Sequence, residues 1–413
     1  MPPTRVSQRN GLTPDHVYGA ALQGFSGFVP PGLLPKLAND PDVLRITPNR
    51  MVSIIGKPDK TGGGKGGKPG GGDPPPPPPE GQIVPEGVAR VGAPLAHAVG
   101  ITGGGVGVAI VDTGIDFNHV DLAANLRPEW HSSFPGLTAQ DDHAHGTHVA
   151  GIVAAVDNSE DVLGVAPDAG LYAVKVLDHW GDGSDAEVIA GLDWIVANAA
   201  LVDPPIKVAN LSLGRPASAD DSLLQAAIQR VVSAGVTVVA AAGNDCGLEV
   251  SQLVPAGFPE VIAVASSTAQ DGIADRRLQP IQADTASFFS TDGAYDPATG
   301  IGISISAPGE TQEDVGKGGA ITSVGILSTL IGGGTVGMSG TSMAAPHVTG
   351  AVALLLQVEA TLAPEDLRTV LMMSADGRGP GGLPTVSPTA CHSGNDGESE
   401  GILNVATALG LVP

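Results

Sequence analysis

Residues 106–116 read VGVAIVDTGID, an apolar run that ends in a carboxylate and a glycine. A run without polar alternation is typical of a strand that is covered on both faces, as strands of parallel sheets are. We therefore expect a buried strand that ends at Asp112 and turns at Gly114. Four more runs of this kind lie at residues 171–176, 206–211, 236–241 and 261–265.

Helical patterns alternate with these strands. Such alternation implies parallel pairing through right-handed crossovers, with helices on both faces of the sheet. The sequence thus predicts a doubly wound, mostly parallel α/β fold whose functional sites gather at the carboxyl ends of the strands. Aromatic residues make up only 3% of the chain, so the core must consist of Ala, Val, Ile and Leu. The expected helices are residues 145–156, 185–199, 221–235 and 341–360.

Four polar residues stand where such sites form. Asp112 could orient another side chain or simply close a loop. His145 opens a helix in HGTHVAG, where an imidazole can act as a general base near neutral pH. Asn244, after VTVVAAAG, could donate its amide to an oxyanion or belong to a turn. Ser342, in GMSGTSMAAPHV, begins a long helix whose N–H groups could face an oxyanion, and helix capping is the alternative.

A metal site is a second interpretation of the histidine block. Its spacing, H-x-H-x-x-H, lacks the glutamate of the H-E-x-x-H motif, so we do not expect zinc. His148 lies nearly one turn after His145, and we expect it to be packed or hydrogen-bonded. The residues that this alternative would use are Asp141, Asp142, His143, His145 and His148.

The blocks DTGID, HGTHVAG, AAAGN and GTSMAAPHV together resemble those of the subtilisin-like serine proteases, the subtilases. Their order along the chain is that of the subtilisin triad and not of the chymotrypsin or α/β-hydrolase triads. The resemblance covers essentially all of residues 81–413. It implies a serine endopeptidase of broad specificity with Asp112, His145 and Ser342 as the catalytic triad and Asn244 in the oxyanion hole.

The resemblance also implies how a substrate binds. One strand would pair with an extended peptide by β-addition, and small residues on both walls of the primary pocket would admit sizeable side chains. Arg215 stands where subtilisins often have glycine, which leaves its effect on the outer subsites open. The implied residues are Ser212, Leu213 and Gly214 in the strand, and Ala241, Ala242 and Gly243 in the opposite wall.

Calcium is a further implication of the resemblance. The segment VAAVDNSEDVLGVAP, residues 153–167, resembles the loop that supplies oxygens to a tight calcium site in the family. A polar loop that only ends a helix is the alternative. Six oxygen ligands suit Ca²⁺. The implied ligands are the side chains of Gln82, Asn158 and Asp121 and the carbonyls of Val156, Glu160 and Val162. The bond Val254–Pro255 likewise matches a cis-proline of the family.

The N-terminal part resembles the C-terminal half of a subtilisin propeptide, which chaperones folding and inhibits the active site until it is cleaved. We therefore expect a small, partial α+β propeptide at 1–56, a Gly/Pro-rich linker at 57–80 and a peptidase domain at 81–413. Glycines make the linker flexible at first, and six prolines then stiffen it. The expected partners are polypeptide substrates and the chain's own propeptide, in cis or in trans.

Charge is divided unevenly along the chain, whose net charge is −23. Residues 1–80 hold nine basic and six acidic residues, a net of +3, and the remainder therefore carries −26. An acidic body argues against nucleic acid as a partner, because phosphate contacts need Lys and Arg. We also expect no membrane partner and a monomer. A basic propeptide should be steered onto the acidic domain.

The sequence leaves open where the protein acts. The N-terminus has no apolar signal core, yet a propeptide and a calcium loop favour secretion; a cytoplasmic processing protease and a catalytically idle binding module are the alternatives. Cys246 and Cys391 could form one disulfide or remain thiols. Three segments look longer than the family's loops and could rim the cleft: residues 276–286, 293–301 and 309–325.

Overall fold

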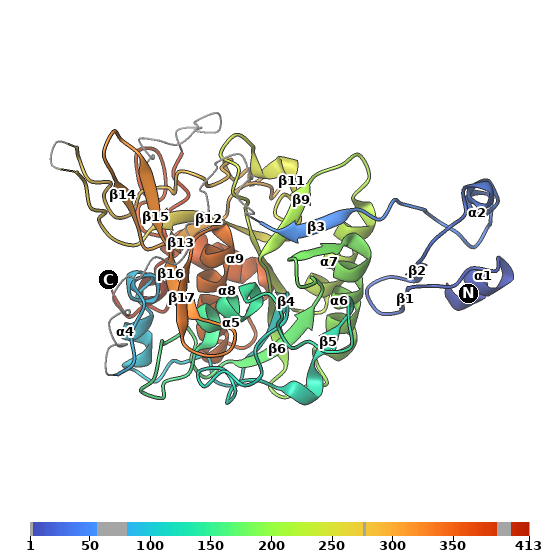
Figure 1. Ribbon diagram of the computed structural model, residues 1–413, viewed down its shortest axis with the longest axis horizontal. Coiled ribbons are helices and arrows are strands. Elements are labelled where there is room, and N and C mark those ends of the chain that lie inside the picture. Colours follow the sequence, from blue (N-terminus) through green and yellow to red (C-terminus); the bar gives the residue numbers. More distant parts are fainter. Residues whose placement is uncertain (1–2, 56–80, 276–277, 386–397, 413) are drawn as a thin grey trace, which may run out of the picture.

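A seven-stranded parallel sheet forms the centre of the molecule in the computed structural model, which describes residues 3–55, 81–275, 278–385 and 398–412 (Figure 1). The strands lie in the order β13-β12-β10-β8-β4-β6-β5, and all neighbouring pairs are parallel. This confirms the predicted fold class. The strands are β4 (Gly107–Asp112), β5 (Ser132–Ser133), β6 (Gly170–Lys175), β8 (Ile206–Leu211), β10 (Thr237–Ala241), β12 (Ile262–Thr268) and β13 (Ile305–Glu310).

Helices cover both faces of this sheet, as the alternation of strands and helices predicts. Because successive side chains of a strand point to opposite faces, Val108 and Ile110 of β4 join one apolar cluster and Ala109 joins the other. The first cluster contains α5 (His145–Ala154) and α8 (Thr341–Val358), and the second contains α6 (Asp185–Asn198) and α7 (Ser222–Ser233). These bounds differ from the predicted ones by at most two residues.

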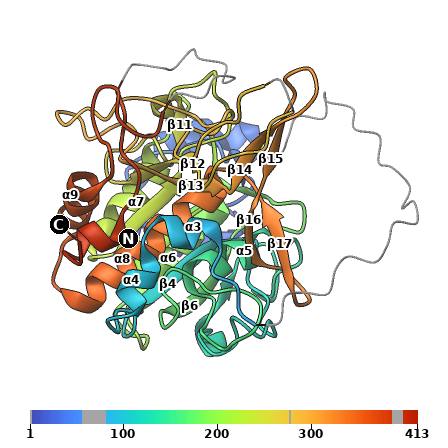
Figure 2. The same cartoon turned by 90° about the vertical axis from the view of Figure 1, so that its left-hand side faces the viewer.

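Helix α8 is the central helix of the core. It is long and apolar enough to cross a membrane by length and composition alone, but 89% of that stretch is buried inside the protein. It packs against β8, β10, β12 and β13. The remaining helices of the body are α3 (Glu86–Arg90), α4 (Ala93–His97), α9 (Pro364–Ser374) and α10 (Val405–Ala408), with 3₁₀ turns η2 (Pro128–Trp130) and η3 (Val250–Gln252); Figure 2 shows α3 and α4 beside α8.

Two antiparallel hairpins follow β13. The first, β14 (Gln312–Val315) and β15 (Ile321–Val324), is formed by the long segment 309–325; the second is β16 (Ile326–Thr329) and β17 (Thr335–Met338). At the base of the first hairpin the carboxyl groups of Glu310 and Glu313 are fully buried and lie close enough to interact. Burial and the neighbouring carboxyl group raise the pKa of Glu310 to about 9, so this pair shares a proton at neutral pH.

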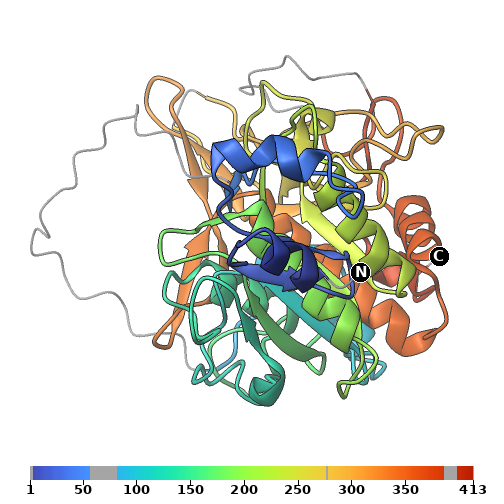
Figure 3. The same cartoon turned by 90° about the vertical axis from the view of Figure 1, so that its right-hand side faces the viewer.

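The N-terminal segment projects from one side of the body (Figure 1) and contacts α6 through its strand β1; Figure 3 views the molecule from that side. It contains α1 (Pro3–Arg9), β1 (His16–Tyr18), β2 (Gly24–Ser26), η1 (Pro31–Leu33), α2 (Leu34–Ala38) and β3 (Met51–Ile54). The Tyr18 hydroxyl donates to the Ala186 carbonyl at 3.1 Å, and the carboxylate of Asp193 accepts from the amides of Gly19, Ala20 and Ala21. An acidic side chain of the body thus binds the turn after β1.

Strand β3 leaves this segment and enters the body. It is a central strand of a four-stranded sheet, β11-β9-β3-β7, with β7 (Asp182–Ser184), β9 (Leu213–Pro216) and β11 (Leu253–Val254). The Val254–Pro255 bond is cis, as predicted. The expected linker and Cys391 lie outside the described residues; Cys246 is disulfide-bonded, and its pairing with Cys391 stays a prediction.

Candidate active site

Asp112 and His145 meet at the carboxyl end of β4. Nδ1 of His145 lies 2.8 Å and 3.0 Å from the two carboxylate oxygens of Asp112, and both residues are buried. Burial of the ring would lower the pKa of His145, but the charge and hydrogen bond of Asp112 outweigh it and raise that pKa. The Asp112 contact occupies Nδ1 and leaves Nε2 available for proton transfer.

Asp141 fixes the start of α5, a role that the sequence did not reveal. One carboxylate oxygen accepts from Oγ1 of Thr113 at 2.9 Å, and the other accepts from the amide and hydroxyl of Thr147. Thr113 in turn accepts the amide of Gly146. Asp141, one of the residues that a zinc site would use, therefore organises the helix that carries His145. The only local signal was an acidic residue four positions before a helix start.

His148 is a packed core residue, as expected. It is fully buried, and its Nε2 lies 3.0 Å from the carbonyls of Ile326 and Val336. Burial lowers the pKa of His148 to about 3, so the ring stays neutral.

Asn244 and Ser342 converge on one carbonyl oxygen, that of Ile55. Nδ2 of Asn244 donates to it at 3.1 Å, and Oγ of Ser342 donates to it at 3.2 Å. Oδ1 of Asn244 accepts from the amide and hydroxyl of Thr341, which holds the amide in this orientation. Gly340 is required here, because it adopts φ 151° and a Cβ would lie 2.9 Å from Asn244 Nδ2. Residue 55 was not singled out from the sequence.

Helices α5 and α8, which carry His145 and Ser342, pack against each other. Among the described residues no hydrogen bond joins Oγ of Ser342 to His145. Oγ contacts two carbonyl oxygens instead, those of Ile55 at 3.2 Å and Ser212 at 3.3 Å. The structure thus brings Asp112 together with His145 and Ser342 together with Asn244, while the link between the two pairs stays a prediction.

The expected peptide-binding strand does pair with an extended segment. In β9, Leu213 is opposite Ile54 and Gly214 is opposite Ser53, both antiparallel, and Ser212 Oγ donates to the Ser342 carbonyl. On its other side β3 pairs with β7, and the amide of Ile54 donates to the Gly181 carbonyl at 2.9 Å. This second edge was missed because only the helix after residue 184 had a clear pattern.

The walls expected for the primary pocket are small and close to the bound segment. A Cβ on Gly214 would lie 3.0 Å from Cδ1 of Ile55, so that side chain packs over the glycine. Ala241 and Ala242 are fully buried, and the amide of Gly243 donates to Oγ1 of Thr341. A branched side chain therefore fits against this strand.

The residues expected to bind calcium lie together. Nε2 of Gln82 donates to the carbonyls of Val156 and Val162 at 2.6 Å and 2.8 Å. One carboxylate oxygen of Asp121 accepts from Nδ2 of Asn158, and the other accepts from the amide of Val162. Burial raises the pKa of the Asp121 carboxyl, and its hydrogen bonds only partly oppose this. Turning the Gln82 amide about its last bond would place its oxygen beside the Val156 and Val162 carbonyls, an arrangement that suits a cation. The Asn158 oxygen accepts the Glu160 amide instead.

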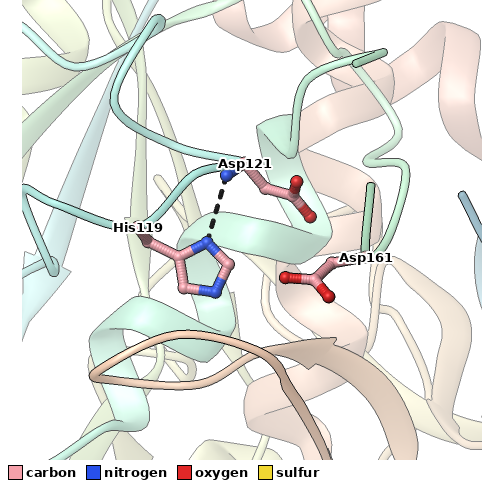
Figure 4. Close-up of side chains that lie close together, drawn as sticks. All are labelled: His119, Asp121 and Asp161. Atoms are coloured by element: carbon pink, nitrogen blue, oxygen red, sulfur yellow. Dashed lines mark hydrogen bonds between the residues drawn. The ribbon is translucent and has the colours of Figure 1, made fainter. Parts of the chain in front are cut away.

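A second acidic residue, Asp161, lies within this loop (Figure 4). Ligand atoms of His119, Asp121 and Asp161 all lie within 4.8 Å of one another. His119 uses both ring nitrogens, however: Nδ1 accepts from the Asp121 amide at 3.1 Å, and Nε2 donates to the Gly334 carbonyl at 2.9 Å. The two carboxylates, rather than the imidazole, are therefore available to a metal ion.

Comparison with known proteins gives consistent matches. A model of the subtilase family matches residues 103–401. Subtilisin amylosacchariticus of Bacillus subtilis subsp. amylosacchariticus is 38% identical over 299 residues, which are 71% of this chain and 66% of that protein. Subtilisin Savinase of Lederbergia lenta is 40% identical over 300 residues, 72% of this chain and 93% of that protein. M-protease of Shouchella clausii is also 40% identical, and the match covers 66% of it.

Proposed function

This chain belongs to the subtilase family, and from that premise we propose that it is a serine endopeptidase whose first substrate is its own N-terminal segment. The observation that carries the proposal is the position of the Ile55 carbonyl, which accepts hydrogen bonds from both Asn244 and Ser342. Side chains that meet on a peptide carbonyl are what acyl transfer requires. The bond after Ile55 is then the bond that is cut.

In this mechanism Oγ of Ser342 attacks the carbonyl carbon of Ile55 while Nε2 of His145 takes its proton. Asp112 keeps the imidazole in the tautomer with Nδ1–H and stabilises its cation. The amide of Asn244 and the backbone N–H of Ser342 stabilise the oxyanion. The C–N bond then breaks, the amine leaves with the proton from His145, and water hydrolyses the acyl-enzyme.

Strand β3 occupies the position that we expect other substrates to take. An extended polypeptide would pair with Leu213 and Gly214 on one side and with β7 on the other, and side chains up to the size of isoleucine would rest on Gly214. We propose broad specificity, with Ala241, Ala242 and Gly243 as the far wall of the pocket. The uncut segment excludes other substrates, so the precursor should be inactive in trans.

The test is to express the whole chain and measure the intact mass of its products. We expect a cut after Ile55, and labelling of Ser342 by a fluorophosphonate probe once the segment has left. Ser342→Ala should remain uncut and unlabelled. A cut that persists in this variant, or an intact wild-type chain that never reacts with the probe, would refute the proposal; the second outcome favours a binding module.

We also propose a structural calcium site at Gln82, Asp121, Asn158 and the carbonyls of Val156, Glu160 and Val162. Support comes from the convergence of these groups and from the buried Asp121 carboxyl, whose charged form a cation would stabilise. The ion would supply no step of peptide cleavage. It would bind the native state only and so stabilise it. We also propose that the protein is exported and that it acts as a monomer. Locating the cut enzyme inside or outside the cell tests the export.

A further inference from the structure

The segment that carries the proposed cut site touches the body well upstream of the cleft. The Arg50 carbonyl accepts the amide of Asp185 at 2.9 Å, and Oδ1 of Asn49 accepts the amide of Ala186 at 2.9 Å. Strand pairing therefore continues to the start of α6. If Ile55 is counted as the first residue before the bond, Arg50 is the sixth.

Two arginines of this segment contact one exposed aspartate. Nη1 of Arg50 donates to the carbonyl of Asp220 at 3.1 Å. Nη1 of Arg45 lies 3.4 Å from the Asp220 carboxylate and also donates to the hydroxyl of Ser222. Hydrogen bonds from Ser222 lower the pKa of Asp220, and the charges of Arg45 and Arg50 lower it further. The carboxylate is thus ionised at any pH at which the enzyme is expected to work.

A buried arginine fixes the loop that carries Asp220, by contacts with the neighbouring Asp221 and with Asp185. Arg215 is 8% exposed, and its Nε and Nη2 donate to the two carboxylate oxygens of Asp185 at 2.9 Å and 2.8 Å. Nη2 also donates to Asp221 at 2.8 Å, and Asp221 accepts the amide of Ser218. A planar guanidinium with several donors suits such a bridge, whereas lysine does not. Arg215 thereby joins the start of α6 to the loop that carries Asp220.

We propose that residues 216–222, positioned by Arg215, form an upstream subsite that selects polypeptides with a basic side chain at the sixth position before the cut. This inference rests on the proposed function and adds a specificity that small walls around Ile55 cannot supply. The hydrogen bond from the Asp185 amide to the Arg50 carbonyl sets the position of the chain. The Asp220 carbonyl accepts from the Arg50 guanidinium, and the Asp220 carboxylate, which Arg45 contacts, favours a positive charge on both side chains. Arg215 acts as a positioning residue.

Docking is tested in the full chain with Ser342→Ala, where residues 45–55 stay attached whatever the chemistry of the wild type. Hydrogen exchange of the amides of β3 reports how often the strand leaves the cleft. We expect Arg50→Ala to speed this exchange about two- to fivefold, and Arg50→Glu to speed it about tenfold, since exposed ion pairs are individually weak. Both effects should shrink as salt rises. Lys36→Ala makes the same charge change on the exposed face of α2 and should leave the exchange of β3 unaltered.

The role of Asp220 is tested by coupling. The two charges interact if Asp220→Asn reduces the effect of residue 50. In the Asp220→Asn background, the change in the exchange rate of β3 caused by Arg50→Glu should be smaller by about half or more. Asp168→Asn is the matched control, because this exposed aspartate precedes β6 at the opposite end of the sheet. An exchange rate that does not depend on residue 50, or a dependence that Asp220→Asn leaves intact, would overturn the proposal.

Selectivity is then measured on the enzyme that its own cleavage releases. Peptides of residues 45–60 with Arg, Ala or Glu at position 50 should be cut with kcat/KM falling about two- to fivefold at each step. Arg215→Lys should raise KM for the Arg50 peptide with little change in kcat, because the loop is displaced while the catalytic groups are not. Equal kcat/KM values would refute the subsite and leave the proposed function standing. Failure to cut any peptide would refute the proposed function, while hydrogen exchange would still decide the subsite.

Discussion

The two ends of the bound segment are held by different physics. At Ile55 the contacts are partly buried, and the partners are fixed by further hydrogen bonds, such as those from Thr341 to Asn244. At Arg45 and Arg50 the contacts are with Asp220, whose side chain is 38% exposed. Buried hydrogen bonds depend on geometry and little on salt, whereas exposed charges are individually weak and screened. One end can therefore serve chemistry and the other selection.

The largest predicted effect is the loss of activity when the negative charge of Asp112 is removed. Asp112→Asn should lower kcat by about 10⁴, the size known for this change in a chymotrypsin-type triad. Because Asp112 raises the pKa of His145, its loss should also move the acid limb of kcat/KM to lower pH, since the base must be neutral to act. A pH profile of the residual activity checks this. An acid limb that stays in place would show that His145 is not the titrating base.

Loss of the oxyanion donor should cost less. Asn244→Ala should reduce kcat by about 10²–10³, a magnitude taken from a related subtilisin, with KM nearly unchanged. Asn198→Ala, at the end of α6, is a matched control that should leave kcat as in the wild type. The ratio of kcat between the wild-type enzyme and Asn244→Ala should be the same when the Arg50→Ala peptide is the substrate. A ratio that changes would mean that the two ends are energetically coupled.

The loop proposed to bind calcium lies at neither end of the bound segment, so changes there should affect stability separately from either end. A ligand at a hundred times its dissociation constant stabilises the native state by about 2.7 kcal/mol, or about 5 °C in a chain of this size. Chelation should lower Tm by that amount in the wild type and hardly at all in Asp121→Ala. Asp168→Asn should keep the full response. A chelator effect that survives in Asp121→Ala would place the ion elsewhere.

The buried carboxyl pair of Glu310 and Glu313 should have a smaller and pH-dependent effect on stability. The pKa of Glu310 is raised to about 9, whereas in the unfolded chain it is near 4.5. The folded state therefore binds the extra proton between these values, and stability falls as pH rises through that window. Glu310→Gln should raise Tm by about 2–5 °C at pH 8–9 and leave it unchanged at pH 5. Glu365→Gln, on the exposed side of α9, should give the same difference at both pH values.

Much of the buried end was predictable from the sequence because its residues lie in local motifs. Asp112, His145, Asn244 and Ser342 each stand at the end of a strand or the start of a helix, and these positions follow from apolar patterns that the fold preserves. The helix bounds were accurate for the same reason. Local patterns do not require knowledge of which distant segments meet.

The exposed end was not predictable, because it consists of contacts between distant segments. Arg215 meets Asp185 across 30 residues, and Arg50 meets Asp220 across 170. No spacing rule relates such pairs. Strand β13 was missed because its sequence, ISAPGE, contains serine and proline rather than a run of branched apolar residues. Asp141 was known as an acidic residue, but its five hydrogen bonds depend on the turn that precedes α5.

Gln82 already contacts Val156 and Val162 while the Ile55 carbonyl still accepts from Asn244. The chain between residues 55 and 82 need not be broken for both contacts to exist. The proposed ion binding and the proposed cut therefore require no fixed order, and we expect a scarcity of calcium to make the precursor less stable without delaying its cleavage. Once the bond is broken, the pace of activation depends on how fast residues 45–55 dissociate, and dilution or high salt should act as the trigger.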